Sequence, residues 1–76
     1  MKTEADYAAL VKGLLKAELK RRNLTYDELA RRLTERGFPE SAENISNKIS
    51  RGKFTAVFMI QCLDAIGCKS LNLVEL

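Results

Sequence analysis

The chain has 76 residues, of which 46% are hydrophobic and 30% are charged, a composition typical of one small folded domain rather than a disordered segment. Its net charge of +3 favours a polyanionic partner only weakly, and the absence of histidine excludes a histidine-dependent catalytic or zinc site. No apolar run approaches the roughly 18 residues of a membrane span, and residues 1–7 lack the apolar core of a signal peptide. We therefore expect a cytoplasmic protein without a membrane partner.

The first predicted helix runs from a Thr3 cap to about Arg22. Asp6, three residues after Thr3, completes an approximate capping box, and Asn23 is a plausible left-handed stop. Gly13 lowers the helix propensity and indicates that a neighbouring element approaches closely. Helical spacing places five apolar residues on the buried side: Leu10, Val11, Leu14, Leu15 and Leu19.

The second predicted helix has the clearest start in the chain. Thr25 is its cap, Glu28 completes a capping box, and Leu24 and Leu29 occupy the positions of a hydrophobic staple. Gly37 ends the helix. The residues expected to face inward are Leu29, Ala30 and Leu33.

The third predicted helix begins after a Ser41 cap and stops at Gly52. At about 100° per residue, Ala42, Ile45 and Ile49 form one apolar stripe. Asn47 projects away from this stripe, and the same outer side carries further amides and bases. Such side chains can read base edges and hold phosphates, although a solvated polar face gives the same pattern.

A fourth helix is predicted between a Thr55 cap and Gly67, with Phe54 and Met59 as a staple. It is apolar on nearly every side, which predicts burial on more than one side and suggests a partner surface. We expect Phe58 and Met59 of this helix, with Leu71 and Leu73 of a short extended C-terminal tail, to form a homodimer interface. Two cysteines, Cys62 and Cys68, are expected to remain free thiols.

These elements predict an all-α chain: one domain spanning residues 1–76, folded as a compact bundle of four or five helices. Three blocks resemble the phage repressor and Cro-like helix-turn-helix family: LTYDELA at 24–30, ISNKISRGK at 45–53 and CLDAIG at 62–67. In that family the first block starts a helix that braces the motif on the DNA backbone, the second is the recognition helix, and the third lies in the core. The connection TERGFPES, at 34–41, makes the turn longer than is usual in the family. The sequence also resembles a small bacterial group of such domains with no assigned function.

The leading interpretation is a DNA-binding module, a transcriptional regulator that presents helix 41–51 to the major groove of double-stranded DNA. In this interpretation Asn44, Asn47 and Arg51 contact base edges. The expected phosphate ligands are Thr25, Tyr26, Lys48 and Lys53.

The second interpretation is a protein-interaction or homodimerisation module that uses the apolar helix 55–66 and the tail without specific DNA binding. The two interpretations are compatible, because repressors of the resembled type often bind as dimers. An enzyme is the third and least favoured class, since the chain has no phosphate-cradling glycine loop and no cluster of metal ligands. We expect no catalytic residue, metal, cofactor or small-molecule ligand.

Overall fold

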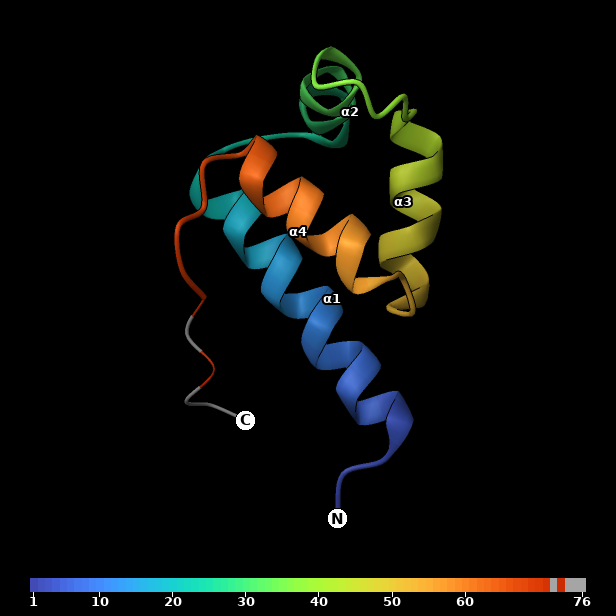
Figure 1. The fold of residues 1–76 in the computed structure, drawn as a ribbon. Coiled ribbons are helices and arrows are strands. Elements are labelled where there is room, and N and C mark those ends of the chain that lie inside the picture. Colours follow the sequence, from blue (N-terminus) through green and yellow to red (C-terminus); the bar gives the residue numbers. More distant parts are fainter. Residues whose placement is uncertain (72, 74–76) are drawn as a thin grey trace.

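The structure, a computed structural model, describes residues 1–71 and 73 of the chain. This part contains four helices and no strand: α1 (Glu4–Arg21), α2 (Tyr26–Glu35), α3 (Ala42–Arg51) and α4 (Ala56–Ala65). Both α3 and α4 pack against α1 and α2, and the N-terminal half of α1 projects beyond the other helices (Figure 1). The predicted all-α class is confirmed, with four helices in the described residues.

Each helix begins after a predicted cap whose side-chain oxygen accepts a hydrogen bond from the backbone N–H three residues on, at 3.0–3.2 Å: Thr3, Thr25, Ser41 and Thr55. At α1 the box is complete, since the Thr3 N–H donates to the Asp6 carboxylate at 2.8 Å. At α2 only half of it forms, because Glu28 pairs with Arg31 at 2.7 Å instead. The helix starts are therefore the best-predicted part of the fold.

The helix ends also follow the sequence, with one correction. Asn23 takes the predicted left-handed conformation, at φ 58°. Gly52 ends α3 at φ 64°, and a Cβ added to it would lie only 2.5 Å from the carbonyl oxygen of Ala8 in α1. The close approach expected at Gly13 is wrong, since nothing lies within 4 Å of a Cβ built there. The contact of a glycine with a neighbouring helix occurs instead where α3 meets α1.

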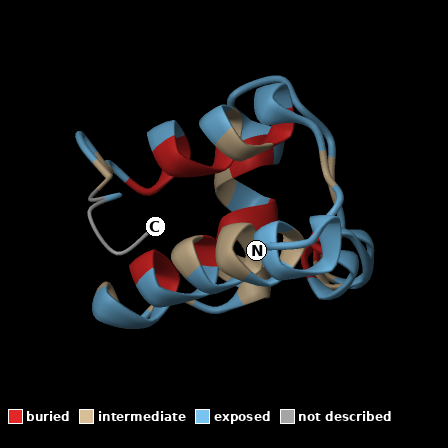
Figure 2. Ribbon diagram, turned by 90° about the horizontal axis from the view of Figure 1, so that it is seen from below, coloured by how far each residue is buried: buried red, intermediate tan, exposed pale blue. Residues whose placement is uncertain are grey.

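The core fills the space between the four helices (Figure 2). The three inward residues predicted for α2 are all buried, as are Ile45 and Ile49 of α3. In α1, Leu15 and Leu19 are buried. The earlier members of the α1 stripe are only half-buried, because this half of α1 projects from the bundle: Leu10, Val11 and Leu14.

Helix α4 is not buried on every side. Phe58 is only 6% exposed and belongs to the core, whereas Val57 and Ile60 are 66% and 62% exposed. The structure thus removes Phe58 from the surface available to a partner, and Val57 and Ile60 take its place. Met59 and Leu71 are half-buried against the core, and Leu73 is exposed. The rest of the predicted tail interface, residues 72 and 74–76, lies outside the described residues. Within them, no helix has the length and apolar character needed to cross a bilayer.

A buried carboxylate, which the apolar pattern did not predict, ties the end of α1 to the segment after α4. Glu18 pairs with Arg22 at 2.6 Å and also with Arg21. The Cys68 thiol lies 3.6 Å from the same carboxylate and donates to the Ser70 carbonyl oxygen at 3.2 Å. Hydrogen bonds from Arg22 and Arg21 hold the pKa of Glu18 below its ordinary value.

This lowered pKa predicts a pH-dependent contribution to stability. A carboxylate with a lowered folded-state pKa stabilises the fold above its unfolded pKa, about 4.3, and loses this contribution as the pH falls through the folded value. We expect Glu18→Gln to lower the free energy of unfolding at pH 7 by more than the roughly 0.5 kcal/mol of ordinary surface substitutions. Urea denaturation at pH 7 and at pH 3 should show the difference from wild type shrinking in acid. If the difference in the free energy of unfolding between Glu18→Gln and wild type is the same at both pH values, the charged Glu18 carboxylate does not stabilise the fold.

Candidate nucleic-acid interface

Helix α3 lies at the edge of the bundle, held by a buried stripe and open on its outer side (Figure 1). Ile45 and Ile49 are fully buried against the rest of the core. On the outer side, Asn44, Asn47 and Arg51 are exposed, as predicted from the helical phase. No hydrogen bond or ion pair joins these three side chains to any other described residue. Their donors and acceptors therefore point to solvent and can meet a ligand.

Lys48 differs from this expectation. Its ammonium pairs with the Glu40 carboxylate at 2.8 Å and lies 4.6 Å from the centre of the Phe58 ring. The Glu40 side chain is only 12% exposed, so part of the charge of Lys48 is neutralised at a sheltered site. Lys48 thus fixes the flank of α3 to the connection before it. A phosphate contact from Lys48 would require exchange with Glu40, which the sequence pattern did not predict.

Two lysines lie at the C-terminal end of α3. Lys53 is 3.5 Å from Glu4, but both side chains are largely exposed, so this ion pair is weak and easily exchanged. Lys12 of α1 reaches the Ser50 carbonyl oxygen at 3.4 Å. A cation at this position also complements the negative end of the α3 dipole. Together with Arg51, these lysines concentrate positive charge at one end of the helix.

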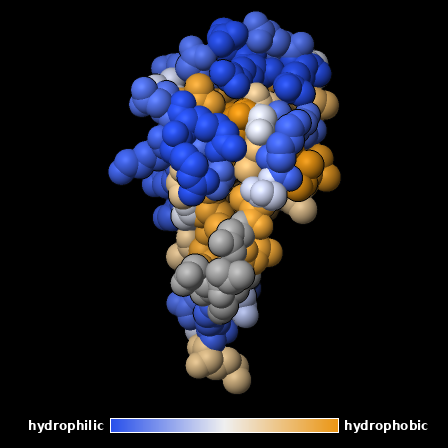
Figure 3. Space-filling model, turned by 90° about the vertical axis from the view of Figure 1, so that its left-hand side faces the viewer, coloured by the Kyte–Doolittle hydropathy of each residue, from blue (hydrophilic) through white to orange (hydrophobic). Residues whose placement is uncertain are grey.

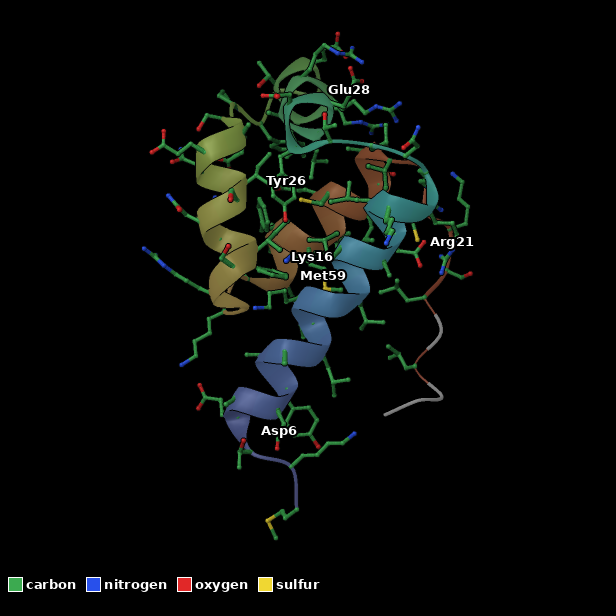
Figure 4. All side chains as sticks on the ribbon, turned by 180° about the vertical axis from the view of Figure 1, so that it is seen from behind. Asp6, Lys16, Arg21, Tyr26, Glu28 and Met59 are labelled. Carbon is green, nitrogen blue, oxygen red and sulfur yellow. The ribbon has the colours of Figure 1, made fainter. Side chains whose placement is uncertain are left out.

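The two predicted phosphate ligands of α2 lie in a surface groove beside α1. Tyr26 extends from the start of α2 toward Lys16 (Figure 4). Burial raises the pKa of Tyr26, which keeps its phenol protonated and able to donate. The Thr25 oxygen accepts the capping hydrogen bond, so its O–H can still donate outward. The remaining lining residues are Lys16, Leu19, Lys20, Asn23 and Leu24.

The structure adds three lysines that the sequence analysis did not assign to the site. Lys12, Lys16 and Lys20 are spaced four residues apart on α1, and we call them the basic ridge. It runs from the Ser50 carbonyl oxygen of α3 to the groove at the start of α2. The spacing of four is a signal visible in the sequence. That the ridge joins α2 to α3 depends on packing.

The other arginines bind within the fold rather than along this surface. Arg31 pairs with Glu28 and Glu35 along α2. The remaining contacts fix α1, α2 and α4 to one another or to local carboxylates: Arg21 and Arg22 with Glu18, Arg32 with the Ala65 carbonyl oxygen, and Arg36 with Asp64. Among the arginines, Arg51 is thus the one whose side chain makes no such contact with a described residue.

The potential metal ligands and the thiols are placed as follows in the described residues. No three His, Cys, Asp or Glu side chains gather there as they would around a metal ion. Cys62 is buried, and burial raises the pKa of its thiol to about 12, which keeps it neutral and a poor nucleophile. The exposed side of α3 carries amides and a guanidinium together with the Glu43 carboxylate in its first turn, and cations line α1 beside it.

Residues 7–71 match the model of a family described as Domain of unknown function (DUF6471). No curated protein matches the chain. No solved structure matches it either. Because the family model spans most of the sequence, the chain belongs to the DUF6471 family.

Proposed function

We propose that this domain binds double-stranded DNA through the outer side of α3, as a module of a transcriptional regulator. The observation that carries the proposal is the pair of exposed amides with Arg51 on a helix whose opposite side is fully buried. The major groove, about 12 Å wide, admits such a helix. The side chains of Asn44, Asn47 and Arg51 make no hydrogen bond or ion pair with a described residue, so DNA binding would break no such contact.

In this proposal α2 and α3 form a helix-turn-helix unit with a lengthened turn. The two helices pack together, and residues 36–41 connect them. The ion pair between Lys48 and Glu40 joins α3 to this connection and supports a fixed angle between the two helices. The family resemblance of the three sequence blocks supports the same arrangement.

The roles follow from the side-chain chemistry. Asn44 and Asn47 are suited to bidentate pairing with adenine, and Arg51 to pairing with guanine. Lys53 and the basic ridge are suited to phosphates on either side of the groove, together with the start of α2. Lys48 is a secondary phosphate ligand, because Glu40 competes for it.

Substitutions should separate base contacts from phosphate contacts. We expect Asn47→Ala and Arg51→Ala each to cost about 1–3 kcal/mol of binding free energy and to relax preference at one position of the site. Lys53→Ala should weaken all sequences alike and lower the salt slope by about one. Selection from random-sequence duplexes, followed by titration of the selected and scrambled sequences, measures both effects.

Arg31→Ala is the matched control, because it removes the same charge from an arginine that pairs within α2. It should change affinity far less than Arg51→Ala. If the three α3-side variants show only a uniform, salt-sensitive loss, α3 does not read bases and binding is non-specific. If no duplex is enriched and none binds at low salt, the proposal fails and an interaction module without DNA takes its place.

A further inference from the structure

An exposed stripe runs along one side of α4. Val57, Ile60 and Asp64 follow one another at spacings of three and four residues, so they share one side of the helix. The two apolar members are each about two-thirds exposed, although the opposite side of α4 is buried in the core. A surface groove lined in part by Ile60, Leu63 and Leu71 runs beside the stripe. Apolar residues also gather on the side of the molecule below the hydrophilic end around α2 (Figure 3).

The charges of α4 are arranged differently from those of the other helices. The first turns of α1, α2 and α3 carry acids and their last turns carry bases, which complements the helix dipole. Helix α4 has no acid in its first turn and no base in its last turn. Asp64 lies exposed near its C-terminal end, where the dipole is already negative, and pairs at 2.7 Å with the exposed Arg36. At the C-terminal end, Arg32 donates to the Ala65 carbonyl oxygen at 3.2 Å, so that end is complemented within the fold. The first turn of α4 is left without an acid.

We propose that a second copy of this chain covers the stripe, with the two α4 helices antiparallel across a two-fold axis near Ile60. In that arrangement each Asp64 lies beside the first turn of the partner's α4, where the positive end of a helix dipole lacks an acid. Ile60 packs against the partner's Ile60 near the axis, and each Val57 lies beside this contact, because a two-fold interface uses the same patch on both copies. A second copy therefore covers the apolar stripe and supplies an acid to the first turn of α4 at once.

The expected contact is small. One exposed helix face and the adjoining groove belong at the low end of protein interfaces, below about 1,200 Å². We expect a reversible dimer with a dissociation constant in the micromolar range. The inference does not depend on DNA binding, so either can fail without the other.

Sedimentation equilibrium of the full chain, from about 1 to 500 µM, tests the dimer. Wild type should show a monomer–dimer equilibrium, and Ile60→Lys should weaken association at least tenfold. Circular dichroism and thermal melting confirm that this variant remains folded, which is expected for an exposed position. A wild-type monomer throughout this range would overturn the proposal. In that outcome the stripe would be free for a different protein or for the end of the chain itself.

Charge variants test the antiparallel direction. Ala56 is exposed in the first turn of α4 and faces the partner's Asp64 in this geometry. Ala56→Glu should weaken dimerisation several-fold through repulsion, and Ala56→Lys should strengthen it. As a fold-level effect, Ala56→Glu should raise the thermal midpoint of the monomer, because it supplies the missing first-turn acid. Because Ala56→Glu should weaken dimerisation but raise the thermal midpoint of the monomer, an effect on association can be told apart from an effect on folding.

Ala5→Glu is the matched control, since it places the same acid in the first turn of α1, away from the stripe. It should leave the dissociation constant unchanged. Equal effects of Ala5→Glu and Ala56→Glu on dimerisation, or no effect of Ala56→Lys, would overturn the antiparallel arrangement.

Discussion

Replacing Gly52 by alanine is expected to destabilise the domain by about 2–5 kcal/mol. Two costs combine at this position. A left-handed conformation costs a residue with a Cβ about 1–2 kcal/mol. Overpacking against the backbone of Ala8 adds about 1–3 kcal/mol, because the clashing atom is a carbonyl oxygen of α1 and cannot rotate away. Urea denaturation followed by circular dichroism measures the loss.

Gly13→Ala provides the control in the same helix bundle. Gly13 is exposed inside α1 and a Cβ there meets nothing within 4 Å, so alanine should raise stability by roughly 0.5–1 kcal/mol. The two glycine-to-alanine substitutions should therefore change the free energy of unfolding in opposite directions. A neutral Gly52→Ala would mean that α3 does not end against α1 as described, and the placement of Arg51 and Lys53 beside α1 would be lost.

Ile49→Ala is expected to cost about 2–5 kcal/mol. Ile49 is completely buried in the last turn of α3, and truncating such a side chain removes transfer free energy and leaves a cavity. Ser50→Ala, at the next and exposed position, should stay within about 0.5 kcal/mol of wild type. Chemical denaturation of the two variants measures the phase of α3. Equal stabilities would show that the phase is wrong, and with it the choice of Asn47 as an outward residue.

The helix boundaries and the phases of α2 and α3 could be predicted because their signals are local. A hydroxyl before each helix satisfies free backbone N–H groups, and a left-handed residue follows each helix end. In α3 the apolar residues occupy one narrow stripe, so only one phase buries them. These features depend on residues a few positions apart, which a sequence displays directly.

The phase of α4 could not be predicted for the opposite reason. Apolar residues surround this helix, so no single orientation buries all of them, and packing against α1 and α2 decides that Phe58 turns inward while Ile60 turns outward. The prediction at Gly13 fails for a similar reason, because a glycine in a sequence does not show which neighbour approaches it. Both depend on tertiary contacts rather than on local pattern.

The candidate site likewise contains features that the local pattern predicts and features that depend on tertiary contacts. Exposure of Asn44, Asn47 and Arg51 follows from the helical phase and was predicted. The pairing of Lys48 with Glu40 joins residues on either side of a helix cap, and periodicity carries no information about that ion pair. The basic ridge was visible as a spacing of four, but its position beside α3 and the start of α2 arises only when the helices pack.

Binding of wild type to duplex DNA across a salt series tests whether the outer side of α3 is a DNA-binding surface. Fluorescence anisotropy with a labelled duplex of random sequence, from low salt upward, gives the logarithm of the binding constant against that of the salt concentration. We expect binding at low salt that weakens linearly on this plot, with a slope of about −0.9 for each phosphate contacted, and a weaker affinity for Arg51→Ala. Absence of binding at the lowest salt, or an affinity unchanged in Arg51→Ala, would contradict the proposal that the outer side of α3 is a DNA-binding surface.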